Sequence, residues 1–162
     1  AQLAAPWLGV RAGMRVLDAC AAPGGKTAHL TELAEIELTS IEADAPRARR
    51  IRENLDRIGL HAQILVADAR STSSWWDGTP FDRILLDALC TASGVVSRHP
   101  DGKWLKRAED VQHLVRQQAR LLDALWPLLK PAGKMLYATC SLFRAENAEQ
   151  MTAQIAKLKR AR

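Results

Sequence analysis

Short apolar runs alternate with amphipathic stretches along the whole chain. Five of these runs are brief, mostly apolar and flanked by turn residues, which is the pattern of buried strands. They cover residues 14–20, 37–44, 62–68, 81–88 and 133–140. Between them, apolar residues recur every three or four positions, as on the buried face of a helix. This alternation predicts an α/β fold in which a mostly parallel sheet carries helices on both faces.

Four helices are expected between and after these strands. The first is the segment 25–34, and the last begins near Ala148 and runs to the basic end of the chain. Apolar stripes at helical spacing mark the two others: Ala48, Ile51, Leu55 and Ile58, and then Val111, Leu114, Val115, Leu122, Leu125 and Trp126. Pro127 and Pro131 are expected to end the third helix. The stretch from about Leu89 to Lys106 has no clear period, and loops of that length are usually functional or disordered.

Composition and charge narrow the class of protein. The chain has 162 residues, 48% of them apolar and 25% charged, which suits one soluble domain. Three cysteines are an odd and low count that argues against a disulfide framework, so we expect a cytoplasmic protein. No apolar run reaches membrane-spanning length, and the net charge of +5 mildly favours an acidic partner such as RNA. The sequence starts at Ala1 rather than Met, and we expect a fragment of a longer protein.

Chemically active side chains lie where the predicted strands end. Asp18, Glu42, Asp68 and Asp87 each close one of the first four strands, and Cys140 closes the fifth. Cys90 follows the fourth strand closely. The carboxyl ends of parallel strands share one edge of the sheet, where ligands bind in open α/β folds. One acidic strand end would mean only a turn, but together these residues predict a crevice lined by carboxylates and thiols.

The turn after the first strand, DACAAPGGKTAHL, contains Gly24 and Gly25, which permit a sharp bend and close approach of a ligand. A P-loop, GxxxxGK[ST], would need glycine at position 20, where this chain has cysteine. The dinucleotide fingerprint GxGxxG is also absent. A nucleoside without phosphate remains, with Glu42 as acceptor for ribose hydroxyls and Asp68 for the adenine amino group. This is the pattern of an S-adenosylmethionine site, although a GG pair alone would indicate an ordinary turn. The expected cofactor-binding residues are Cys20, Ala21, Ala22, Pro23, Gly24, Gly25, Lys26, Glu42, Asp68 and Asp87.

Four motifs, DACAAPGGKT, LLDALCTASGV, RHPDGKW and YATCS, resemble the RNA 5-methylcytosine methyltransferases of the Sun/Fmu (RsmB) family over essentially the whole chain. The resemblance implies a Rossmann-like S-adenosylmethionine-dependent methyltransferase fold that lacks its last strands. It also implies methyl transfer to carbon 5 of a cytidine in small-subunit ribosomal RNA. We expect residues 1–162 to form one such domain, without the family's amino-terminal RNA-binding region. We further expect a monomer that uses no metal and no membrane.

The resemblance also assigns roles to four residues. Cys140 is the nucleophile that adds to carbon 6 of cytosine, and Cys90 assists elimination and release of the product. Asp87 holds the exocyclic amine or a ring nitrogen of cytosine, and Lys26 reaches the base. The family has proline directly before the cysteine that corresponds to Cys90, where this chain has Leu89. Because proline would fix the backbone angle, we expect Cys90 to be less rigidly aimed, and product release is the affected step.

Two basic groups are candidates for contact with RNA. The first lies in the long irregular stretch and comprises Arg98, His99, Lys103, Lys106 and Arg107, with Trp104 either stacking on a base or anchoring the loop. The second, Arg47, Arg49, Arg50, Arg52 and Arg57, is better explained as a solvated helix face. Two other functions remain open: a cofactor-binding fragment without independent catalysis, and a P-loop-like nucleotide hydrolase, which the missing glycine disfavours.

Overall fold

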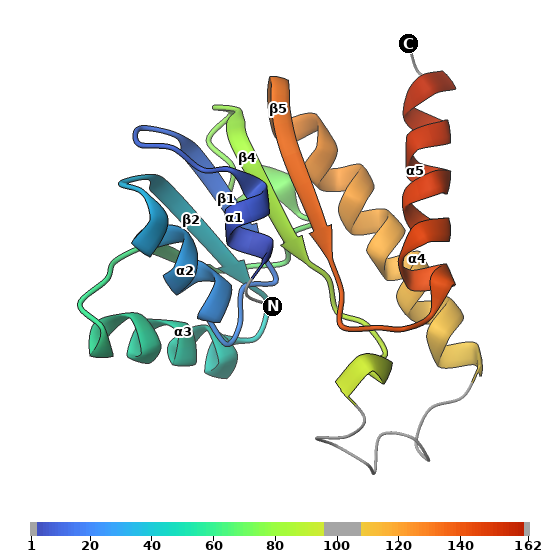
Figure 1. The fold of residues 1–162 in the computed structure, drawn as a ribbon, viewed down its shortest axis with the longest axis horizontal. Coiled ribbons are helices and arrows are strands. Elements are labelled where there is room, and N and C mark those ends of the chain that lie inside the picture. The colour runs from blue at the N-terminus through green and yellow to red at the C-terminus, as the bar shows by residue number, and fades with distance from the viewer. Residues whose placement is uncertain (1–2, 96–107, 161–162) are drawn as a thin grey trace. The chain divides into compact units, whose positions relative to one another are not determined.

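A five-stranded sheet is the framework of the chain in the computed structural model, which describes residues 3–95 and 108–160. The strands are β1 (Arg15–Ala19), β2 (Glu37–Glu42), β3 (Gln63–Val66), β4 (Phe81–Asp87) and β5 (Leu129–Ala138). Their order is β3-β2-β1-β4-β5, and β1 pairs in parallel with both β2 and β4, as β2 does with β3. β5 runs in the same direction as β4 (Figure 1). The five predicted strands and the parallel α/β class are therefore confirmed.

The helices follow the predicted alternation closely. They are α1 (Ala4–Leu8), α2 (Gly25–Leu33), α3 (Ala45–Arg57), α4 (Ala108–Leu125) and α5 (Ala148–Arg160), of which α1 has no predicted counterpart. Short 3₁₀ turns lie at η1 (Thr72–Ser74), η2 (Ser93–Val95), η4 (Trp126–Leu128) and η5 (Arg144–Glu146). Among the described residues, no helix is both long and apolar enough to cross a membrane.

Three predicted details are wrong, and all concern the ends of elements. Trp126 is not part of the stripe of α4, because α4 ends at Leu125 and Trp126 is exposed in η4. Pro131 does not close a helix, because β5 already starts at Leu129. Proline is tolerated there since β5 is at the edge of the described sheet, and the adjacent Ala132 has a positive φ of 62°. Ile58 is not part of a buried stripe: it is the residue that caps the end of α3, and it is 45% exposed.

A hydrophobic cluster on one face of the sheet packs α1 and α2 against the strands. It joins Leu8 of α1 and Leu30 of α2 to Val16, Leu38 and Leu85 of the strands. Side chains alternate between the two faces of a strand. Asp18 therefore lies on the same face as Val16, directed towards α2, and this alternation decides where the first carboxylate of the predicted site lies.

The chain divides into two compact units. The first, called here the sheet unit, comprises Ala1–Asp87 and Ala124–Tyr137, and the second, the cysteine unit, comprises Ala88–Asp123 and Ala138–Arg162. All the carboxylates of the predicted cofactor site belong to the sheet unit. Cys90 and Cys140 belong to the cysteine unit.

Candidate functional site

The turn between β1 and α2 uses its two glycines for different purposes. Gly24 has a φ of +97°, and a Cβ there would lie 3.0 Å from Cγ2 and 3.2 Å from Cα of Ile51 on α3. This glycine therefore lets the turn pack onto α3. A Cβ on Gly25 would meet nothing within 4 Å among the described parts of the chain. Gly25 starts α2, whose first amides lack intrahelical acceptors, so its open side can admit a ligand.

Glu42 lies beside this turn and is only 4% exposed. Its Oε2 accepts a hydrogen bond from the amide of Ala22 (3.3 Å), and its Oε1 accepts one from the amide of Asp44 (3.2 Å). The guanidinium of Arg47 lies 3.6 Å from Oε1. The amide of Ala21 donates to the carbonyl of Ile41 (3.1 Å), which ties the turn to β2. A carboxylate has about four acceptor sites, so Glu42 retains capacity for hydroxyl donors.

Asp68 follows β3 and is held by Arg70. The Arg70 guanidinium donates to both carboxylate oxygens, at 2.6 Å to Oδ2 and 2.9 Å to Oδ1, and the Arg70 amide donates to Oδ1. These hydrogen bonds keep the pKa of Asp68 below its ordinary value. The amide of Ala67 donates to the carbonyl of Glu42 (3.1 Å), so this segment lies next to the end of β2. An adenine amino group would share Asp68 with Arg70, a partner that the sequence pattern did not indicate.

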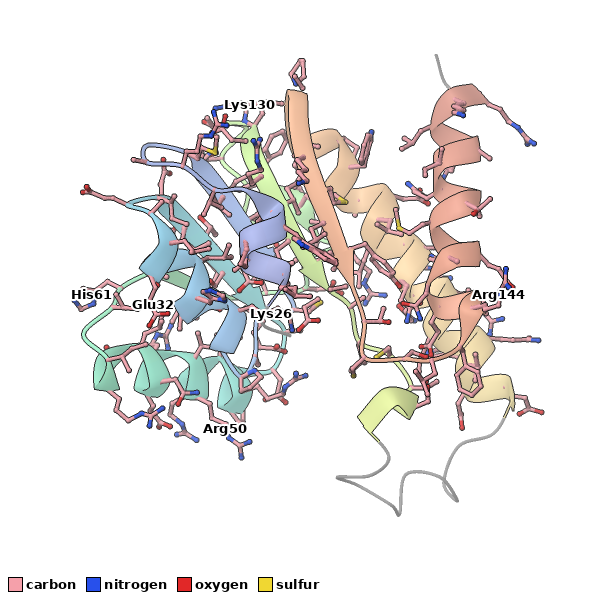
Figure 2. All side chains as sticks on the ribbon, in the orientation of Figure 1. Lys26, Glu32, Arg50, His61, Lys130 and Arg144 are labelled. Atoms are coloured by element: carbon pink, nitrogen blue, oxygen red, sulfur yellow. The ribbon has the colours of Figure 1, made fainter. Side chains whose placement is uncertain are left out.

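Asp18, Lys26 and Asp87 form a third group of charged residues, after those around Glu42 and Asp68. Lys26 at the start of α2 (labelled in Figure 2) makes an ion pair with Asp87 at the end of β4. Asp18 is fully buried; its Oδ2 accepts a hydrogen bond from Thr27 (2.6 Å), and its Oδ1 has no partner among the described residues. Burial, reinforced by the charge of Asp87, raises the pKa of Asp18 to about 7, although Thr27 and Lys26 act in the opposite direction.

Cys20 is close enough to three of these carboxylates for their charges to act on it, and it is not suited to nucleophilic attack. Burial is the main reason that its pKa rises to about 12, and the charges of Glu42, Asp18 and Asp87 add to the effect. Thiolate is the reactive form of cysteine. Cys20 therefore remains a thiol at neutral pH, which suits a lining residue.

The two remaining cysteines contact each other in the cysteine unit. Their Sγ atoms are 3.3 Å apart, and the amide of Cys140 lies 3.3 Å from Sγ of Cys90. Cys90 is partly buried and Cys140 is exposed. The amide of Gly94 donates to the carbonyl of Cys140 (2.9 Å), and a Cβ on Gly94 would lie 2.7 Å from that oxygen. The loops after β4 and β5 therefore meet at the thiols through a contact that requires glycine.

Glu146 accepts hydrogen bonds from both of these loops and was not predicted from the sequence. It is fully buried. Burial disfavours its charge, but hydrogen bonds from Ser141, Thr91 and Gln118 outweigh that effect and keep its pKa below the ordinary value. In the sequence it is one of several polar residues before a helix, and no local signal distinguishes it.

The predicted RNA contacts are only partly described. Arg98, His99, Lys103, Trp104, Lys106 and Arg107 lie outside the described residues. The basic residues of α3 are exposed, and Arg50 extends away from the helix in Figure 2. Within the described part of the chain, no group of three or more His, Cys, Asp or Glu side chains is arranged to hold a metal ion.

The chain is similar to known proteins over essentially its whole length. A family described as 16S rRNA methyltransferase RsmB/F matches residues 5–162. The chain belongs to the RsmB/F family. Two RsmB/F relatives are both called ribosomal RNA small subunit methyltransferase B. The protein from Pseudomonas putida is 52% identical over 100% of this chain and 38% of its own length. The protein from Vibrio cholerae is 52% identical over 94% of this chain and 36% of its own length.

A solved structure supports the fold of this RsmB/F chain. NSun6 from Pyrococcus horikoshii, solved with SFG, superposes with a TM-score of 0.87 at 31% identity, over 96% of this chain and 40% of that one. The predicted Rossmann-like methyltransferase fold is therefore confirmed. The chain spans less than two fifths of the length of the two curated relatives.

Proposed function

We propose that the chain is the catalytic part of an S-adenosylmethionine-dependent methyltransferase that modifies carbon 5 of a cytidine in small-subunit ribosomal RNA. The observation that carries the proposal is the 3.3 Å contact between the thiols of Cys90 and Cys140, on the loops after β4 and β5. Methylation at carbon 5 needs one thiol to add to the ring, and a second group can assist its departure. The family match and the names of the relatives, which specify ribosomal RNA of the small subunit, supply the substrate class.

The cofactor assignment depends on the sheet unit. Glu42 offers buried carboxylate oxygens for ribose hydroxyls, Asp68 offers an acceptor for the adenine amino group, and the open side of Gly25 leaves space for the ligand. The NSun6 structure contains SFG, an analogue of S-adenosylmethionine. When bound, S-adenosylmethionine supplies an electrophilic methyl group that an activated carbon 5 can attack.

The chain's own residues supply the activation. The thiolate of Cys140 forms a bond to carbon 6 of cytosine, and the electron pair of the 5,6 double bond becomes available at carbon 5. Asp87, held by Lys26, binds the exocyclic amine or a ring nitrogen and favours this flow of electrons. After methylation, a base takes the proton from carbon 5, and the electron pair of that C–H bond restores the double bond and expels the Cys140 thiolate. Cys90 assists this last step.

A second candidate is a cofactor-binding fragment without independent catalysis. The observation that favours it is length, because the relatives carry more than half of their residues outside the matched segment. Such a fragment would bind S-adenosylmethionine through the sheet unit and would leave RNA unmodified.

The test is a pair of cysteine variants, measured in this chain and in a chimaera that places the chain in the Pseudomonas putida relative. Nucleoside mass spectrometry of a small-subunit ribosomal RNA fragment should show 5-methylcytidine with the wild-type chimaera and none with Cys140→Ala. Cys90→Ala should accumulate a covalent protein–RNA adduct on a denaturing gel, because addition proceeds while release is slowed. Unchanged methylation by Cys140→Ala would exclude its assigned role.

The same pair of proteins separates the two candidates. The fragment hypothesis predicts that the isolated chain binds S-adenosylmethionine in calorimetry and that only the chimaera forms product. Comparable turnover by the isolated chain would exclude it.

A further inference from the structure

Glu146 is a buried carboxylate without a part in the chemistry proposed above. It ends η5, two residues before α5 begins, and it has no exposed surface. Burying a charged group is costly unless hydrogen bonds compensate for the lost water. The groups that donate hydrogen bonds to Glu146 therefore indicate which parts of the chain its carboxylate holds in place.

The hydrogen bonds of Glu146 reach the residue after each cysteine. Its Oε1 accepts from the amide of Thr91 (3.0 Å), and its Oε2 accepts from the hydroxyl of Thr91 (2.6 Å) and from the hydroxyl of Ser141. Thr91 follows Cys90, and Ser141 follows Cys140. The two hydroxyls also lie 3.1 Å from each other. A single carboxylate thus connects the two segments that carry the thiols.

Gln118 of α4 extends this connection to the other side of Cys90. Its buried Nε2 donates to Oε1 of Glu146 (3.0 Å) and to the carbonyl of Leu89 (2.9 Å). The backbone is therefore held on both sides of Cys90, at the Leu89 carbonyl and the Thr91 amide. These hydrogen bonds restrain the position at which the family has proline.

The Cys140 side is restrained in a similar way. The side-chain amide of Asn147 donates to the carbonyls of Ser141 (2.9 Å) and Phe143 (3.0 Å), and the hydroxyl of Ser93 accepts from the amide of Leu142 (2.8 Å). The loop after β5 is thereby fixed around Ser141, whose hydroxyl donates to Glu146. Moving this carboxylate would loosen both loops at once.

We propose that Glu146 is a positioning residue that sets the distance between the thiols of Cys90 and Cys140. Its catalytic meaning rests on the proposed function, since attack and release then occur on one base. The geometric part stands independently of RNA. A displacement of about 1 Å in a reacting group can reduce a rate about a hundredfold.

Thiol proximity can be measured without RNA by using phenylarsine oxide. Its trivalent arsenic forms one bond to each of two neighbouring thiols, and its oxygen leaves as water with the two thiol protons. The wild-type chain should bind one equivalent, and Cys90→Ala or Cys140→Ala should abolish this binding. Glu146→Ala should weaken it at least about tenfold, as judged by competition with a dithiol.

Two further variants separate positioning from folding. Glu146→Gln keeps an acceptor for the Thr91 amide, and the hydroxyls of Thr91 and Ser141 can rotate to accept from the new amide, so it should restore most of the binding. Ser141→Ala removes the hydroxyl that donates to Glu146, together with its contacts to the hydroxyls of Thr91 and Ser93 and the acceptor of the Phe143 amide. It should weaken binding several-fold even if Glu146→Ala does not fold. Glu149→Gln, which alters an exposed residue three positions away, is the matched control. Wild-type arsenical binding by folded Glu146→Ala, or by Ser141→Ala if the former does not fold, would overturn the proposal.

Kinetics in the chimaera supply the catalytic readout. Glu146→Ala should lower kcat about a hundredfold and leave KM for RNA within about twofold, because the thiols and not the RNA contacts are displaced. A raised KM with unchanged kcat would contradict the positioning role. If the chimaera methylates no RNA while the arsenical results hold, the proposed function fails and the geometric role of Glu146 stands.

Discussion

Asp18 carries a carboxylate where the fold disfavours its charge. Its pKa rises from 3.8 to about 7, chiefly through burial. Between these values the unfolded chain has lost the proton while the folded chain keeps it, so the free energy of unfolding falls as pH rises. Each unit of pH contributes up to about 1.4 kcal/mol, which makes the total loss on the order of 4 kcal/mol. Asp18→Asn should flatten this slope in urea unfolding measured from pH 4 to 8.

The matched control is Asp56→Asn, which changes an exposed residue of α3. It should leave the slope of unfolding free energy against pH unchanged. An equally steep fall in the Asp18→Asn protein would assign the slope to another group. The asparagine retains an acceptor for the Thr27 hydroxyl, so the comparison isolates the ionisation of Asp18.

Neighbouring glycines of the β1–α2 turn should respond differently to alanine. Gly24→Ala places a Cβ against Ile51 in a residue with a positive φ. We expect the free energy of unfolding to fall by about 1–3 kcal/mol. Gly25→Ala meets no neighbour and should leave stability within about 1 kcal/mol. If the cofactor passes its open side, Gly25→Ala should still weaken S-adenosylmethionine binding in calorimetry. Unchanged affinity would remove Gly25 from the cofactor site.

The elements show which features local sequence can specify. The strands and most helices were predictable because apolar spacing and turn residues are local signals. The acidic residues also lie where they were predicted, at the carboxyl ends of the strands. Pro131 was misplaced because only the edge position of β5 makes proline acceptable in that strand. The burial of Glu146 could not be predicted, because it depends on partners such as Thr91 and Gln118 that lie distant in sequence. Arg70 is only two residues from Asp68, but that spacing alone does not show that their side chains pair.

The start of α3 gives a prediction for a whole element. The Asp44 carboxylate accepts a hydrogen bond from the amide of Arg47 (2.8 Å), which caps the helix, and Arg47 in turn lies near Glu42. Asp44→Ala should cost about 1 kcal/mol in unfolding free energy, whereas Asp44→Asn should cost much less because asparagine also caps helices. Urea unfolding measures both. Equal losses in the two variants would show that capping is not the cause.

At the scale of the whole molecule, the division into two units separates the proposed cofactor residues from the proposed thiols. Glu42, Asp68 and the glycine turn belong to the sheet unit, whereas Cys90, Cys140 and the Glu146 network of Gln118, Thr91 and Ser141 belong to the cysteine unit. Binding of S-adenosylmethionine and reaction with phenylarsine oxide should therefore respond to different variants. Glu146→Gln and Ser141→Ala should leave the cofactor affinity unchanged.

Hydrogen exchange can locate the cofactor across the whole chain. A ligand present at a hundred times its Kd stabilises the folded state by about 2.7 kcal/mol when it binds only that state. Amides that exchange through local opening are protected further where the ligand touches them. We expect S-adenosylmethionine to slow exchange at residues 20–26 and around Glu42 and Asp68, beyond any change near Ser141 and Glu146. Glu42→Ala should abolish the effect, because it removes the buried acceptor proposed for the ribose hydroxyls. Protection centred on the cysteine unit, or protection that persists in Glu42→Ala, would contradict the proposed cofactor site.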